Sequence, residues 1–111
     1  MDLDSRRADR EAVRAEYPDL FERLSEILFR NDPIGINFES NKDEYESEVG
    51  TILPRLRLVT TVDAVRSVIH DEFVFWFDPE VAGAETRYDA IATEVWALQD
   101  LFPRPHDPSP G

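Results

Sequence analysis

Hydrophobic residues recur every three or four positions along most of this chain, a spacing that places them on one face of an α-helix. The clearest stripe predicts a helix over about residues 18–30. Its buried face consists of Leu20, Phe21, Leu24, Ile27 and Leu28. Pro18 suits the first turn, because the amide hydrogen that proline lacks would have no partner there. The run Asn31-Asp32-Pro33-Ile34-Gly35 is rich in turn-forming residues and should end the helix.

Two further stripes predict helices in the middle of the chain. The first covers about 42–58, with Asn41 as a candidate N-cap and with Pro54, whose ring should kink it between 50 and 54. Its apolar face consists of Tyr45, Val49, Ile52, Leu53 and Leu56. The second covers about 62–77, with Thr60 or Thr61 as its cap. Its core face consists of Val62, Val65, Ile69, Phe73, Trp76 and Phe77.

The helix over 62–77 is also apolar on its opposite side, where Ala64, Val68 and Phe75 lie. We therefore expect it to be the central helix. Either the N-terminal segment or another subunit must cover this second side, which leaves a homodimer as one possibility.

The last predicted helix covers about 85–102, after a short link over 81–84. Its apolar residues have heptad-like spacing and are Tyr88, Ile91, Val95, Leu98 and Phe102. Residues 1–17 carry a thin apolar stripe and are expected to form a weakly docked helix or arm, whereas the proline-rich residues 103–111 are expected to form a disordered tail. The pattern thus predicts an all-α protein, a compact bundle of four to five helices whose helical domain spans 18–102.

Composition is consistent with this picture and narrows the chemistry. The chain has 111 residues, of which 41% are hydrophobic and none is cysteine. One folded core is therefore expected, and disulfides, thiolate catalysis and cysteine metal sites are excluded. The absence of cysteine fits a reducing cytoplasm. The longest apolar run, residues 73–77, is far shorter than the ~20 residues of a membrane span, so no membrane association is expected.

The formal net charge is −12, and it is concentrated toward the C-terminus, because residues 71–111 hold nine acidic and two basic residues. Such a field repels nucleic-acid phosphates and anionic lipids and attracts a basic protein. The alternative interpretation is that the acidity only keeps the protein soluble.

The sequence shows no recognisable catalytic constellation, and we expect no cofactor. His70 has no histidine or glutamate one helical turn away, and His106 lies in the proline-rich tail. Glycine-rich phosphate loops and nucleophile elbows are missing from the sequence. Glu44 and Glu48 lie one turn apart, with Asp32 upstream, which leaves a carboxylate-based metal-binding protein or enzyme as an alternative.

A candidate partner-binding surface lies on the last predicted helix. Trp96 points away from the apolar stripe, and Glu85, Asp89 and Asp100 share its flank. An aromatic ring among carboxylates suits a surface that carries lysine or arginine. The alternative is that Trp96 fills the rim of the core.

The stretch from Asp32-Pro33-Ile34-Gly35 through Asp43-Glu44-Tyr45 and Glu48 to Ile52, with the helices on either side, resembles the YugE-like family of small uncharacterised bacterial proteins. The similarity covers roughly residues 18–100. It implies an all-helical fold and no particular activity. Asp32, Tyr45 and Glu48 are the positions here that match the family pattern. This chain differs from the pattern in its Ile52-Leu53-Pro54-Arg55-Leu56 segment and its acidic C-terminal half.

These observations favour a non-enzymatic interaction module that binds a basic protein. A sharper version is an immunity or inhibitor protein that blocks a cationic toxin through close charge pairs. The alternatives are the metal-binding protein or enzyme centred on Asp32, Glu44 and Glu48, and a homo-oligomer joined through Phe75, Val68 or Trp96.

Overall fold

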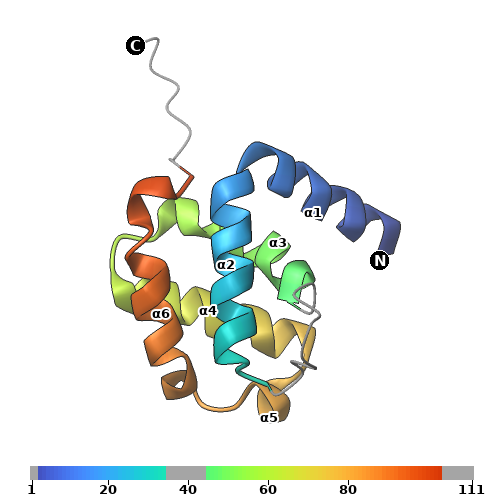
Figure 1. Ribbon diagram of the computed structural model, residues 1–111. Helices are drawn as coiled ribbons and strands as arrows, with labels where there is room; N and C mark the ends of the chain where they lie inside the picture. The colour runs from blue at the N-terminus through green and yellow to red at the C-terminus, as the bar shows by residue number, and fades with distance from the viewer. Residues whose placement is uncertain (1–2, 35–44, 104–111) are drawn as a thin grey trace.

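The computed structural model describes residues 3–34 and 45–103, with side chains from residue 10 onward, and every regular element in these ranges is helical (Figure 1). The α-helices are α1 (Leu3–Glu16), α2 (Pro18–Asn31), α3 (Glu46–Arg55), α4 (Val62–Trp76), α5 (Pro79–Ala82) and α6 (Asp89–Trp96). Three short 3₁₀ helices are η2 (Leu56–Leu58), η3 (Glu85–Tyr88) and η4 (Gln99–Leu101). The predicted all-α bundle is confirmed. The predicted tail beyond Pro103, the candidate cap Asn41 and Glu44 lie outside the described residues.

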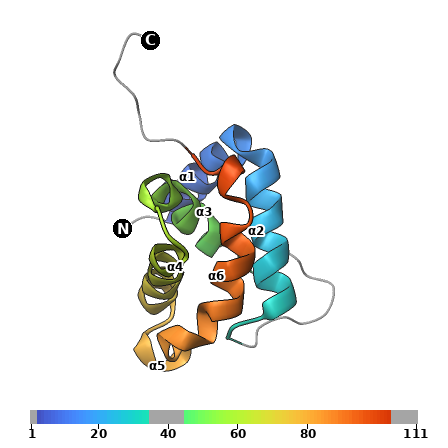
Figure 2. The same ribbon diagram turned by 90° about the vertical axis from the view of Figure 1, so that its left-hand side faces the viewer.

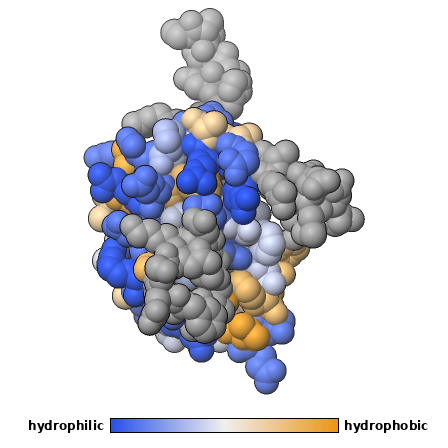
Figure 3. Space-filling view, turned by 45° about the vertical axis from the view of Figure 1, so that its right-hand side comes forward, coloured by the Kyte–Doolittle hydropathy of each residue, from blue (hydrophilic) through white to orange (hydrophobic). Residues whose placement is uncertain are grey.

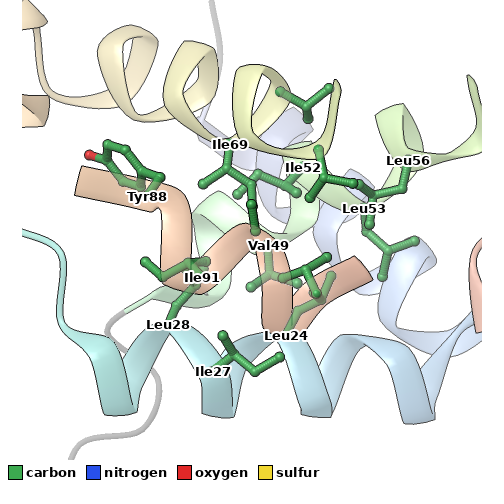
Figure 4. Packing of buried hydrophobic residues seen from close by; sticks show 14 of the residues in the cluster. Leu24, Ile27, Leu28, Val49, Ile52, Leu53, Leu56, Ile69, Tyr88 and Ile91 are labelled. Atoms are coloured by element: carbon green, nitrogen blue, oxygen red, sulfur yellow. The ribbon is translucent and has the colours of Figure 1, made fainter. Parts of the chain in front are cut away.

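The core lies where α2, α3, α4 and α6 meet. Figure 4 shows side chains from all four helices pointing toward one another, among them Leu24, Val49, Ile69 and Ile91. Helices α2 and α6 run side by side in both ribbon views (Figures 1 and 2). The five apolar residues predicted for α2 are all buried, because their spacing keeps them on the face toward α3 and α6.

Local chemistry explains where several helices begin and end. Asp32 follows α2 with a left-handed backbone at φ 47° and ψ 59°, and its amide donates to the Leu28 carbonyl at 2.7 Å. Thr61 caps α4, as predicted, through its hydroxyl, which accepts from the Ala64 amide at 3.0 Å. Asp78 caps α5 in the same way, by accepting from the Val81 amide at 2.8 Å.

Helix α3 ends earlier than the predicted residue 58. Pro54 lies in its last turn, and the chain passes from α3 into η2 at Leu56. Proline cannot donate the hydrogen bond that would continue the ladder, and 3₁₀ turns are common where an α-helix ends.

The predicted helix over 85–102 is divided into η3, α6 and η4. After α6, the Leu98 amide donates to the Val95 carbonyl at 2.9 Å and the Leu101 amide to the Leu98 carbonyl at 2.8 Å, which is 3₁₀ spacing. The tighter turn places Phe102 edge-on against Trp96, with ring centroids 6.1 Å apart. The Trp96 and Phe102 rings therefore pack together where the α-helix changes to a 3₁₀ turn after α6.

Helix α4 is buried on two sides, but the predicted core face needs correction. Val68, expected on the opposite side, is buried at 8% exposure, and α4 contacts α3, α5, η3 and α6. Val62 is 37% exposed and Phe75 is 61% exposed, so the ends of the helix extend past the covering elements.

Helix α1 lies along α3 (Figures 1 and 2). The contact is largely polar: Arg14 pairs with Glu46 at 3.1 Å, and Arg10 donates to Ser47 at 3.4 Å. Gly50 permits the close approach, because a Cβ there would lie 3.2 Å from the Cβ and Cγ of Arg10. Val13 adds an apolar contact with the core. The segment predicted as an arm or weakly docked helix thus contacts the bundle through arginines as well as its thin apolar stripe.

Among the helices described, none is both long enough and apolar enough to cross a bilayer.

Candidate functional site

Two of the three candidate positions Asp32, Tyr45 and Glu48 meet in the structure. The Tyr45 hydroxyl donates to Asp32 Oδ1 at 2.6 Å, and the tyrosine ring is fully buried at 0% exposure. A hydrogen bond this short is typical of a hydroxyl and an ionised carboxylate. The bond joins Asp32, which directly follows α2, to Tyr45, which directly precedes α3. Glu48, the third position, is buried at 4% exposure in the first turn of α3.

Only part of the predicted carboxylate site for a metal lies within the described residues. Asp32 is engaged by the Tyr45 hydroxyl, and Glu44 lies outside the described residues. Within residues 3–34 and 45–103, no group of three or more histidine, aspartate or glutamate side chains is placed to hold a metal ion. The described geometry therefore gives this alternative no direct support.

His70 makes contacts that connect two parts of the fold. Its Nε2 lies 2.9 Å from the Gly83 carbonyl, and its ring is 5.6 Å from that of Tyr88. A carbonyl can only accept, so Nε2 carries the hydrogen of this bond. The histidine thereby joins α4 to the link before η3.

Glu85 and Asp89, from the candidate partner-binding surface, come together around Arg66. The arginine lies 3.1 Å from Glu85 Oε2 and 3.0 Å from Asp89 Oδ1, and it also lies 3.5 Å from Asp63. Hydrogen bonds from Arg66 and then Ser67 hold the pKa of Glu85 below its ordinary value. The Glu85 carboxylate therefore remains ionised at neutral pH, and three carboxylates share the Arg66 guanidinium.

Trp96 lies in a different environment from Glu85 and Asp89. It lines a shallow groove of about 160 Å³ at the end of α6. The groove is lined by Leu56, Arg57, Val59, Trp96, Gln99, Phe102 and Pro103. Asp100 is exposed on η4. The break after α6 thus places Asp100 outside the helix that carries Trp96, and the ring packs against the rim of the core.

A further candidate site lies between α1, α2 and α3, and we call it the Ser25 cleft. It has a volume of about 350 Å³. Its lining residues are Arg14, Pro18, Phe21, Glu22, Ser25, Glu26 and Glu46. Arg14 pairs with Glu46 at 3.1 Å, and its guanidinium carbon lies 5.4 Å from the centroid of the Phe21 ring.

One feature of the sequence indicates this cleft, namely a serine among the apolar residues of α2. Ser25 occupies a position on the apolar stripe of α2, one turn after Phe21 and next to Leu24, and it is buried with them. A polar residue at a core position indicates either a hydrogen-bond partner or a site. The position of α1, which decides between these, depends on tertiary contacts.

No protein-family model matches the sequence, and no curated protein and no solved structure matches it either.

Proposed function

We propose that this chain is a non-enzymatic acidic module that binds a basic protein in the cytoplasm. The proposal rests on one observation: single arginines each contact more than one carboxylate. Arg66 contacts three carboxylates, and Arg55 contacts two, Asp71 at 3.6 Å and Glu72 at 2.8 Å. Each cluster therefore stays negative after its internal ion pairs have formed.

The outer face of α2 adds carboxylates that no arginine pairs with in the described part of the chain. Asp19, Glu22 and Glu26 are exposed along successive turns of this helix, with Arg23 exposed among them. Hydrophilic residues predominate over the coloured part of the face shown in Figure 3, beside a hydrophobic area at its lower right. Together with the net charge of −12, this distribution favours attraction and steering of a positively charged surface.

The sharper form of the proposal is an immunity or inhibitor protein that occludes a basic toxin. A small helical domain with excess carboxylates suits this role, because close charge pairs give fast association and slow dissociation. The resemblance to the YugE-like family is compatible with the proposal and brings no activity with it. Glu85, Asp89, Trp96 and Asp100 remain candidate contacts.

The test is association with small basic proteins, beginning with the products of neighbouring genes, and with acidic proteins of matched size as controls. We expect a basic partner to bind with an association rate that falls at least about tenfold between 0.01 and 0.15 M salt, because the screening length shortens from about 30 to 8 Å. Affinity independent of salt, or binding of the acidic controls alone, would contradict the proposal.

A further inference from the structure

We infer that the Ser25 cleft binds one primary ammonium group on an alkyl stem, such as a lysine side chain of the partner. The inference rests on the proposed function, because it names the group by which a basic protein is recognised. The cleft is formed by α2 and by residues of α1 and α3, so its walls come from three helices.

The first observation is an unpartnered hydroxyl. Ser25 is 7% exposed, and its Oγ is buried without a hydrogen-bond partner. A helical serine ordinarily bonds to the carbonyl one turn earlier or to water, and an unpaired buried hydroxyl is destabilising. A donor brought by a ligand would satisfy this oxygen.

The second observation is the pair of carboxylates beside it. Glu22 and Glu26 lie one helical turn apart on α2, line the cleft with Ser25, and have no ion-pair partner among the side chains described in residues 10–34 and 45–103. Like charges at this spacing repel, so a cation between them is stabilised. The three hydrogens of an ammonium match two carboxylates and one hydroxyl as acceptors.

The third observation favours ammonium over guanidinium. Arg14 already lies over the Phe21 ring at 5.4 Å and already engages Glu46 at 3.1 Å. An incoming guanidinium would thus lack the aromatic face and the carboxylate that suit its flat shape. Pro18 and Phe21 supply apolar surface for an alkyl stem.

Access to the Ser25 hydroxyl requires neighbouring side chains to turn aside. Arg14 is half exposed, at 50%, and Glu22 is exposed, so both have rotamer freedom.

The experiment is an NMR titration of the ¹⁵N-labelled full chain with Nα-acetyl-lysine N-methylamide at low salt. We expect saturable shifts confined to amides around the Ser25 cleft, with a dissociation constant of about 1 mM, typical of a single small contact. The uncharged norleucine analogue should cause no such shifts, and the arginine analogue should bind at least about threefold more weakly. Shifts spread evenly over the acidic surface, or equal binding of the arginine analogue, would overturn the inference.

Variants separate recognition from folding. Ser25→Ala and Glu22→Gln should each weaken lysine-analogue binding by about threefold to tenfold, since the first removes the hydroxyl acceptor and the second removes a negative charge and replaces one carboxylate oxygen with an NH2 donor. Glu80→Gln, which removes the same charge from exposed α5, should change it by less than about 1.5-fold. Ser25→Ala should also raise the melting temperature, because it removes an unsatisfied hydroxyl. Equal effects of Glu80→Gln and Glu22→Gln would overturn the inference.

The variants also distinguish the two proposals. Salt-dependent binding of a basic protein that Ser25→Ala and Glu22→Gln leave unchanged overturns the cleft and leaves the proposed function in place. Lysine-analogue binding in the cleft without any basic protein partner supports the ammonium site and contradicts the proposed function.

Discussion

At the scale of single residues, the buried hydroxyls in the described part of the chain divide into those with a partner and that of Ser25, which has none. The Tyr45 hydroxyl has Asp32, and the Tyr88 hydroxyl donates to the Ala82 carbonyl at 2.7 Å. Burial raises the pKa of Tyr88 above its ordinary value, so this phenol stays protonated and keeps donating. Paired hydroxyls fix the geometry of a core, whereas an unpaired hydroxyl is available to a ligand.

The bond between Tyr45 and Asp32 is expected to contribute to stability. Tyr45→Phe keeps the buried ring and removes only the hydroxyl, so we expect the free energy of unfolding to fall by about 1.5–3 kcal/mol, as for a hydrogen bond to a charged group. Urea unfolding with an unchanged m-value measures this. Asp32→Asn retains an acceptor and should lose less. A Tyr45→Phe variant as stable as the wild type would show that the bond contributes nothing in solution.

At the scale of elements, helix ends that are set by nearby residues could be predicted from the sequence. Helix breaks that depend on tertiary packing could not. Both ends of α2 carry chemical signals, Pro18 and Asp32, and the helix was predicted to within one residue. The break after α6 has no such signal, because residues spaced for an α-helix also fall near one face of a short 3₁₀ turn. Which element covers Val68 was left open by the sequence, because this depends on the tertiary packing around α4.

The same reasoning applies to the candidate sites. Asp32 and Tyr45 were both candidate positions from the sequence, which did not predict the hydrogen bond that joins them in the structure. The Ser25 cleft was not identified, because it requires α1 to lie beside α2 and α3. Helix packing that depends on Arg10 and Arg14 leaves little trace in a hydrophobic pattern.

The docking of α1 gives a prediction at this scale. Gly50→Val adds a branched side chain where even a Cβ would lie 3.2 Å from Arg10. We expect α1 to be displaced, so that its amides exchange with solvent about tenfold faster or more, while amides of α2 and α6 change little. Hydrogen exchange by mass spectrometry measures this, with Glu80→Gln on exposed α5 as a control that leaves the α1 contact intact. Unchanged exchange in α1 would show that the close approach at Gly50 does not hold in solution.

A second prediction concerns the link between α2 and α6. Glu94 accepts from Asn31 at 2.9 Å and from Arg30 at 2.8 Å, and these hydrogen bonds, the one from Asn31 first, hold its pKa below the ordinary 4.5. A lowered folded-state pKa gives a stabilisation that is present above the ordinary value and is lost as the pH falls through the lower one.

Glu94→Gln should therefore be less stable than the wild type at neutral pH, and the two should converge as the pH falls below about 4.5. Urea unfolding across this range measures the difference. Glu80→Gln provides a matched control without an ion-pair partner in the described part of the chain. A gap between wild type and Glu94→Gln that stays constant down to acid pH would contradict the assignment.

At the scale of the whole molecule, the excess of carboxylates has opposite effects on binding and on stability. The charge of −12 attracts a basic partner, and it also opposes the compact state through self-repulsion. The internal ion pairs offset part of this repulsion, but clusters such as that around Arg66 remain negative. The same charge distribution thus favours association and disfavours the isolated fold.

Salt should therefore change stability and binding in opposite directions. Raising NaCl from about 0.01 to 0.2 M shortens the screening length several-fold, which weakens long-range repulsion more than ion pairs in direct contact. We expect the urea midpoint of the free protein to rise over this range while affinity for a basic partner falls. Choline chloride at equal ionic strength should reproduce the rise, which distinguishes screening from binding of sodium. A midpoint that falls with both salts would mean that close ion pairs outweigh the repulsion, and the acidity would then act mainly inside the molecule.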